Sequence, residues 1–304
     1  MAFLFWKTNL KKPQFRGKYC WQNDCFIVQD VWQTVKEVPG GYSKFDGPQR
    51  IITPQGFAEV ILVETPLKLP TEYTKENLNS SKWHIEKMGK PRIGYLSVIV
   101  SSMFTSGALG LTKSVIGDVL FIGLGGGGIS NFVSTAFQKI NVTMVDINPA
   151  TKPMALEQFE VVENAKSRII IEDGAKFIKD QVAKKNVGIF DAIIVDACYN
   201  NRKKPNVCPV DPFMEKEGLV AFKKLLRQSG VVIYNVLVMD AWQNKEEMEK
   251  HILEANTRVF GSKNCRLIPI RFLSNKVLIC SPTGLPREEE QNEIGEQFNK
   301  MFGW

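Results

Sequence analysis

Three aspartates stand where the chain could bind a ligand, because each follows a short apolar run that predicts a buried strand. Asp146 ends the second predicted strand of the C-terminal region, Asp173 follows the third, and Asp196 ends the fourth. The carboxyl ends of parallel strands share one rim of an open α/β sheet, where such sheets bind ligands. A carboxylate there can accept hydrogen bonds from ribose hydroxyls or an adenine amino group. The alternative is that each aspartate caps a helix or a turn.

A glycine-rich turn precedes these aspartates. Residues 119–122 predict a buried strand and residues 129–138 a helix, and five of the six residues from Gly123 to Gly128 are glycine. Gly123, Gly125 and Gly128 satisfy the spacing G-x-G-x-x-G, which brings backbone N–H groups close to a nucleotide-like ligand. Asp146 follows by roughly the 20 residues at which a carboxylate meets ribose hydroxyls. The pattern alone does not separate NAD, FAD and S-adenosylmethionine, and a sharp turn under close helix–strand packing would also explain it.

Charge favours one of these ligands. S-adenosylmethionine carries a sulfonium cation, and a carboxylate at Asp196 would favour positive charge near the reacting centre, whereas a nicotinamide enzyme has less use for one there. We predict that Asp196 orients a neutral nucleophile and accepts its proton. Tyr199 and Asn200, which follow it, are predicted pocket walls or hydrogen-bonding groups. A purely structural role at the strand end is the alternative for Asp196.

The elements that must position these residues alternate along the second part of the chain. Further strands are predicted at residues 142–145, 168–171, 192–195, 231–236, 266–270 and 276–280, and helices at 153–163, 175–184, 219–230 and 248–259. Only a few residues join the last two strands, so they must be antiparallel. The prediction is an α/β fold with a mostly parallel, doubly wound sheet that ends in an antiparallel hairpin.

The N-terminal region shows a different pattern of predicted secondary structure. Apolar segments at residues 25–35, 50–53 and 58–64, separated by turn residues, predict a small β-rich unit, and residues 67–82 read as a loop. We place the domain boundary between residues 85 and 86. Residues 94–112 lack charges for about the length of a membrane span, but their serines and glycines favour a buried helix beside the glycine turn. An apolar stripe near the C-terminus, residues 294, 298 and 301, predicts core packing or a subunit contact.

Composition sets further limits. Hydrophobic residues make up 44% of the chain and charged residues 23%, as in an ordinary globular protein, and the net charge of +7 is dispersed. We expect no membrane contact and no nucleic-acid partner. The six cysteines contain no C-x-x-C pair, so we predict free thiols rather than a metal site, with Cys198 as a small buried hydrophobe. Together with an N-terminal apolar run too short for a signal peptide, this predicts a reducing, cytoplasmic location.

The motifs together resemble a known family, the class I S-adenosylmethionine-dependent methyltransferases of the spermidine synthase-like group. The resemblance rests on Val-Leu-Phe-Ile-Gly-Leu-Gly-Gly-Gly-Gly, Val-Asp-Ile-Asn-Pro, Glu-Asp-Gly and Phe-Asp-Ala-Ile-Ile-Val-Asp. It covers about residues 86–282 and is greatest to the C-terminal half of the elongation factor one alpha methyltransferase. It implies a seven-stranded Rossmann-like sheet, and homodimers are frequent in this group. It assigns S-adenosyl-L-methionine binding to Gly123, Gly125, Gly126, Gly127, Asp146, Ile147, Asp173, Gly174 and Asp196.

Two departures from the pattern separate this chain from the polyamine synthases of the group. Those enzymes carry an aspartate at the position of Gly126, where it receives the amine of decarboxylated S-adenosylmethionine. A second aspartate, three residues after the one that matches Asp196, is Tyr199 here. The resemblance therefore favours methyl transfer to a protein or small-molecule nucleophile. An aminopropyltransferase and a non-catalytic cofactor-binding protein are the alternatives.

Overall fold

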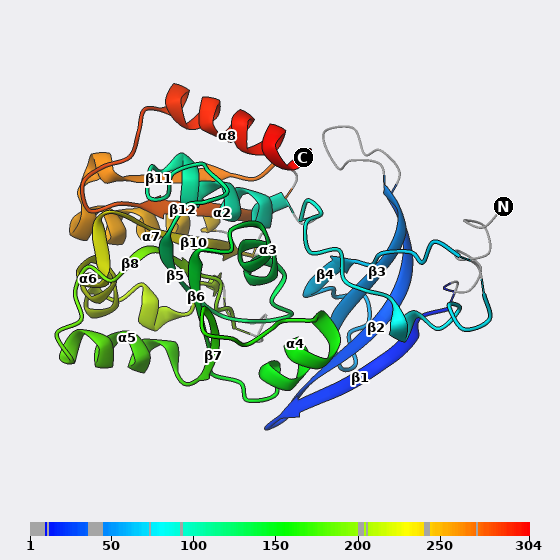
Figure 1. Cartoon of the computed structure of the whole chain (residues 1–304). Helices are drawn as coiled ribbons and strands as arrows, with labels where there is room; N and C mark the ends of the chain where they lie inside the picture. The colour runs from blue at the N-terminus through cyan, green and yellow to red at the C-terminus, as the bar shows by residue number, and fades with distance from the viewer. Residues whose placement is uncertain are drawn as a thin grey trace.

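Two β-sheets lie side by side in the computed structural model, and helices surround the larger of them (Figure 1). The structure describes residues 10, 12–35, 45–72, 74–91, 94–199, 204, 206–239, 244–271 and 273–304. The predicted site residue Asn200 and the N-terminal apolar run at residues 1–6 lie outside this part of the chain. Among the described residues, no helix is long and apolar enough to cross a membrane.

The N-terminal sheet is an antiparallel meander, which confirms the predicted β-rich unit. Its strands are β1 (Gln14–Trp21), β2 (Asp24–Val35), β3 (Phe45–Pro54) and β4 (Val63–Pro66), in that order across the sheet. The strand predicted at residues 58–64 is wrong over most of its length. The chain turns there instead, because the N–H of Phe57 donates to Pro54 O and the N–H of Val60 to Phe57 O. The strand β1 was not predicted.

The larger sheet confirms the mostly parallel order and the antiparallel hairpin at the end. Along its main path the strands follow the order β11-β12-β10-β8-β5-β6-β7. Their bounds are β5 (Gly117–Ile122), β6 (Ile140–Asp146), β7 (Ser167–Ile171), β8 (Phe190–Val195), β10 (Leu226–Val238), β11 (Cys265–Pro269) and β12 (Asn275–Cys280). Only β12 runs against its neighbours on this path. A short additional strand, β9 (Asn206–Cys208), pairs with β10.

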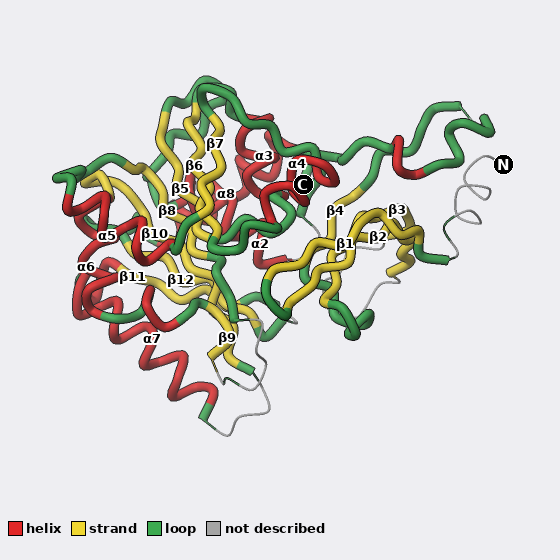
Figure 2. The backbone as a smooth tube through the Cα atoms, turned by 90° about the horizontal axis from the view of Figure 1, so that it is seen from below, coloured by secondary structure: helices red, strands yellow, loops and turns green. Residues whose placement is uncertain are grey.

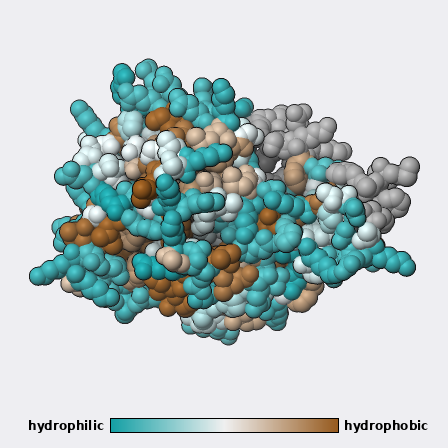
Figure 3. All heavy atoms as spheres, in the orientation of Figure 1, coloured by the Kyte–Doolittle hydropathy of each residue, from teal (hydrophilic) through white to brown (hydrophobic). Residues whose placement is uncertain are grey.

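Helices cover both faces of this sheet (Figure 2). One face carries α2 (Gly94–Thr105), α3 (Gly128–Ala136) and α8 (Glu288–Phe302), and the other α5 (Gly174–Ala183), α6 (Lys216–Leu225) and α7 (Lys245–Phe260). The helix predicted to stop at Gly230 ends at Leu225, because the backbone pairs with Phe190 of β8 from Leu226 onward. Phe298 of the C-terminal stripe is fully buried against Phe104, so this stripe packs in the core. The face in Figure 3 is mostly hydrophilic, with apolar residues in separate patches.

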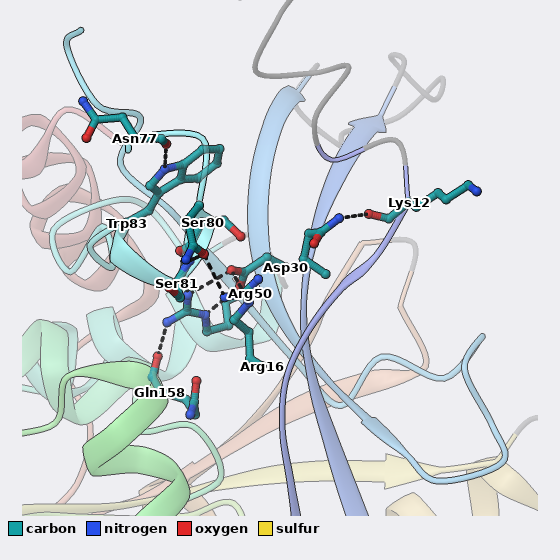
Figure 4. A network of polar contacts seen from close by, with 11 residues as sticks. Lys12, Arg16, Asp30, Arg50, Asn77, Ser80, Ser81, Trp83 and Gln158 are labelled. Atoms are coloured by element: carbon teal, nitrogen blue, oxygen red, sulfur yellow. Dashed lines mark hydrogen bonds and ion pairs between the residues drawn. The ribbon is translucent and has the colours of Figure 1, made fainter. Parts of the chain in front are cut away.

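Helix α4 (Thr151–Phe159) joins the two sheets through a buried polar network (Figure 4). The Arg50 guanidinium of β3 pairs with both carboxylate oxygens of Asp30 on β2, at 2.7 and 3.0 Å. Its Nη1 donates to Gln158 O, 2.7 Å away near the end of α4, where a cation is favourable. Around this network pack eight buried apolar side chains, from Leu10, Val28, Ile52, Leu67, Trp83, Ile85, Met154 and Phe159. The N-terminal sheet is therefore fixed against the segment that follows β6.

All six cysteines form disulfides, so the prediction of free thiols is wrong. The pairs are Cys20–Cys25, Cys198–Cys208 and Cys265–Cys280. The first and third pairs join residues directly opposite each other on antiparallel strands, a separation that a disulfide can span. Because disulfides form and persist in oxidising surroundings, the predicted cytoplasmic location loses the support that free thiols gave it.

Candidate active site

The glycine turn between β5 and α3 needs glycine for two physical reasons. Gly123, Gly125 and Gly127 have φ of +97°, +50° and +70°, which L side chains rarely adopt. A Cβ at Gly123 would also collide with the main-chain oxygen of Asp196 at the end of β8, and a Cβ at Gly127 with the side chain of Val161. At the turn, the end of β5 and the end of β8 are thus in direct contact. Backbone N–H groups before α3 remain close to the rim, as an anionic or nucleotide ligand requires.

Asp146, at the end of β6, is held mainly by backbone donors, and the side chain of Thr151 adds a further hydrogen bond to its carboxylate. Its Oδ2 accepts from the N–H of Leu124 in the glycine turn and its Oδ1 from the N–H of Asn148, both at 2.8 Å. Burial raises the pKa of this carboxyl, and these hydrogen bonds oppose the increase. The residue is partly exposed at the rim, where a ribose hydroxyl can reach it. The adjacent Ile147 is 54% exposed and offers an apolar surface beside that site.

Asp173 caps a helix, which was the simpler of its two interpretations. Its Oδ1 accepts from the N–H groups of Ala175 and Lys176 at the start of α5, at 2.8 and 3.4 Å. The same carboxylate is exposed, so capping does not remove it from a ligand. Gly174 has a packing reason to be glycine, because a Cβ there would lie 2.7 Å from Ile122 Cγ2.

Asp196, at the end of β8, is held by side chains. Its Oδ1 accepts from Nδ2 of Asn235 on β10 at 2.8 Å, and its Oδ2 from the hydroxyl of Tyr95 on α2 at 3.4 Å. Burial raises the pKa of the Asp196 carboxyl above its ordinary value, against the effect of the two hydrogen bonds. Burial, and then the Asp196 charge, raise the pKa of Tyr95, so Tyr95 stays a hydrogen-bond donor. A carboxylate of raised pKa is a better proton acceptor than an exposed one.

Tyr199 is engaged elsewhere. Its hydroxyl accepts from the N–H of Asp211 at 3.2 Å, and the ammonium of Lys204 lies 3.8 Å from its ring centroid. Among the described residues it makes no hydrogen bond to Asp196. Cys198, predicted to be buried, is exposed and bonded to Cys208. Tyr199 and Cys198 are therefore held by contacts with later residues of the chain.

The N-terminal sheet reaches the glycine turn through Val63 of β4, a contact that the sequence did not indicate. A Cβ at Gly126 would lie 3.0 Å from Cγ1 of Val63 on β4 and 3.2 Å from Phe159 on α4. A Cβ at Gly125 would lie 3.5 Å from the same valine. Apolar side chains thus cover the turn at Gly126.

Three features that share the rim fit an adenosyl ligand: the glycine backbone of the turn, the Asp146 carboxylate and the exposed side chain of Ile147. Asp196 lies beside the same turn, in contact with Gly123. Tyr95 and Asn235 are the residues that sequence reasoning missed, because no local spacing connects them to Asp196. Among the described residues, no three histidine, cysteine or acidic side chains form a metal site.

Comparison with known proteins is consistent with this geometry. Residues 99–283 match the family model of the spermine/spermidine synthase domain. The "eEF1A lysine and N-terminal methyltransferase homolog" of Drosophila melanogaster is 27% identical over 191 residues, which are 63% of this chain and 26% of that protein. The chain thus spans about a quarter of the length of that relative.

Two solved structures share the fold. One is human methyltransferase-like protein 13 in complex with SAH, with a TM-score of 0.60 and 21% identity, over 69% of this chain and 93% of that one. The other is a probable spermidine synthase from Corynebacterium glutamicum, with a TM-score of 0.60 and 13% identity, over 94% of this chain and 93% of that one. The second likeness includes the N-terminal sheet.

Proposed function

The chain belongs to the spermine/spermidine synthase domain family, and within this family we propose that it is an S-adenosylmethionine-dependent methyltransferase. The observation that carries this proposal is the environment of Gly126. In the polyamine synthases that the chain resembles, an aspartate at this position receives the amine of the decarboxylated cofactor. Here the position has no carboxylate, and Val63 and Phe159 leave little room for one. A cofactor that keeps its own carboxylate meets no like charge there.

The residues on the rim have distinct roles in this proposal. Gly123, Gly125, Gly126 and Gly127 bring backbone close to the cofactor, Asp146 accepts from the ribose hydroxyls, and Ile147 and Asp173 with Gly174 border the adenine. When bound, S-adenosylmethionine supplies a methyl group on a sulfonium, which is already an activated leaving group. The protein then has to position the acceptor and keep water out.

Asp196 acts on the acceptor. A nitrogen nucleophile must arrive neutral, and the Asp196 carboxylate can orient its N–H and accept the proton that it releases. Tyr95 and Asn235 hold the carboxylate during this step. The name of the Drosophila relative supports an amine on a protein as the acceptor, rather than a small molecule. Homodimers, a cytoplasmic location and a domain boundary after residue 85 stay predictions.

The test compares the two forms of the cofactor. Calorimetry on the purified chain should show tighter binding of S-adenosylmethionine than of its decarboxylated form, and labelled methyl groups should transfer to protein in a size-fractionated cell extract. Gly126→Asp should weaken binding of the intact cofactor. Gly110→Asp is the matched control, because Gly110 has open space around it. Preference for the decarboxylated form would establish an aminopropyltransferase, and binding without turnover a non-catalytic protein.

A further inference from the structure

A chain of side-chain amides runs beneath Asp196 across three neighbouring strands. Asn275 of β12 donates from Nδ2 to Oδ1 of Asn235 on β10, and Asn235 donates from Nδ2 to Oδ1 of Asp196 after β8, both at 2.8 Å. The order β12-β10-β8 in the sheet makes this alignment possible. Asn235 is only 2% exposed, so its amide is shielded from bulk water.

The direction of this chain follows from the chemistry of an amide. A carboxamide has one accepting end and one donating end, and a half-turn of the side chain exchanges them. If Asn235 turned, its oxygen would face the carboxylate of Asp196, and two acceptors would meet in a buried place. Asn275 opposes that half-turn, because its N–H already occupies the oxygen of Asn235. The donor of Asn235 is thus kept toward Asp196.

We infer that Asn235 and Asn275 are positioning residues for Asp196, in which Asn275 fixes the amide of Asn235 and Asn235 holds the carboxylate in place for the acceptor. The arrangement deepens the proposed function, on which its effect on methyl transfer rests. The hydrogen bonds themselves do not depend on that function. They have a consequence that is measurable on the protein alone.

That consequence is the ionisation of Asp196. A donor to the charged carboxylate stabilises it, so loss of the donor raises the carboxyl pKa further. Among the described residues, Tyr95 of α2 is the titratable group that contacts Asp196, and the sulfur of Cys198, 3.8 Å from its Oδ1, is bound in a disulfide. A change in the titration of Asp196 on substitution of either asparagine therefore reports the amide chain.

The experiment is a carboxyl titration by NMR on protein with ¹³C-labelled aspartate, with the Asp196 signal assigned from its absence in Asp196→Asn. Asn235→Leu should raise the pKa of Asp196 by about one pH unit or more. This is the size expected for the loss of a hydrogen bond to a charged group. Asn275→Leu should raise it by less in the wild-type background. It should have no effect in the Asn235→Leu background, because its influence passes through Asn235.

Asn186→Leu is the matched control. Asn186 lies on the segment that leads into β8, at the opposite end of the strand that carries Asp196, and contacts Gln181. Its substitution should leave the titration of Asp196 unchanged. Because Asn275 is partly exposed, Asn275→Leu tests the inference even if Asn235→Leu does not fold.

Two results would overturn the inference: an unchanged Asp196 titration in Asn275→Leu, or an equal shift by this substitution with and without Asn235. In an active enzyme the same variants should lower kcat and shift the acidic limb of the pH–rate profile to higher pH. The KM for the cofactor should stay unchanged. If the wild type methylates no acceptor while the titrations behave as expected, the proposed function fails and the positioning role stands.

Discussion

Two carboxylates of the candidate site, Asp146 and Asp196, are held by different kinds of hydrogen-bond donor. Asp146, on the side that we propose for the cofactor, is held mainly by backbone N–H groups from the glycine turn and from its own loop. Asp196, on the acceptor side, is held by the side chains of Tyr95 and Asn235. Both carboxyls have a pKa raised by burial, so the difference lies in what holds them and not in their desolvation.

This difference suggests how the fold divides its tasks. Backbone donors are fixed by the turn itself and do not change when side chains are substituted, which suits a cofactor that a whole family shares. Side-chain donors can be replaced one at a time without change to the sheet, which suits an acceptor that differs from enzyme to enzyme. Substitutions around Asp146 should therefore weaken cofactor binding, whereas substitutions around Asp196 should slow methyl transfer and leave cofactor binding intact.

The largest expected effect comes from removal of either carboxylate. Asp196→Ala should lower methyl transfer by about 10³-fold, the usual size for loss of a general base, with cofactor binding still measurable. Asp146→Ala should instead weaken cofactor binding itself. Calorimetry and single-turnover transfer measured on both variants check this. Equal loss of binding in the two variants would abolish the distinction between the two sides.

The next largest effect concerns the glycine turn. Gly123→Ala should lower the free energy of unfolding by about 3 kcal/mol and abolish cofactor binding, because it adds a buried collision with Asp196 to an unfavourable φ. Gly56→Ala is the control, since Gly56 has a φ of +85° and open space around it. It should cost only about 1 kcal/mol. Chemical denaturation of both variants separates the collision from the backbone strain.

The same contrast explains what the sequence could and could not predict. The strand, turn and helix from β5 to α3 are local, and Asp146 is placed by the next strand, so a short pattern indicates the cofactor side. Tyr95 lies 101 residues before Asp196 and Asn235 lies 39 residues after it. Only the order of strands in the sheet brings them together. Tyr199 is adjacent in sequence to the site and yet contacts Asp211 and Lys204.

The disulfides were missed for a related reason. Cys20 and Cys25 become partners only when β1 and β2 are paired in the observed register. The strand β1 was not predicted, and the composition of the chain gave no other indication of the pairing. The predicted end of helix α6 at Gly230 was wrong because pairing with β8 overrides the local helical pattern after Leu225.

A smaller effect is expected at the disulfide beside Asp196. Replacement of both Cys198 and Cys208 by serine removes the bond that closes the segment after β8, so the acceptor side should become less ordered. Methyl transfer should fall several-fold, because the acceptor is positioned less precisely, and cofactor binding should not change. The Cys20 and Cys25 double serine variant is the control, because that pair closes the β1–β2 hairpin. An equal loss of activity in both variants would contradict a local role.

The smallest effect is a gain in stability. Burial raises the folded-state pKa of Asp196, so the folded state binds its proton more readily and stability declines as pH rises through the interval between the unfolded and folded values. Asp196→Asn should remove this decline and raise the unfolding midpoint at neutral pH by about 2 °C.

Asp146→Asn should give no such gain, because an amide would turn an NH₂ group toward a backbone N–H. Thermal unfolding at several pH values compares the two variants. A gain of equal size at Asp146 would show that backbone donors do not distinguish its site from that of Asp196.

Val63 of β4 lies against the glycine turn, and Met154 and Phe159 of α4 are buried in the core of the N-terminal sheet. Excision of the first 85 residues would therefore also disturb the part of the protein that remains. It would uncover apolar side chains on α4 and remove Val63 from the glycine turn, so the shortened protein should aggregate. A chimera that replaces this sheet therefore has to replace α4 together with it.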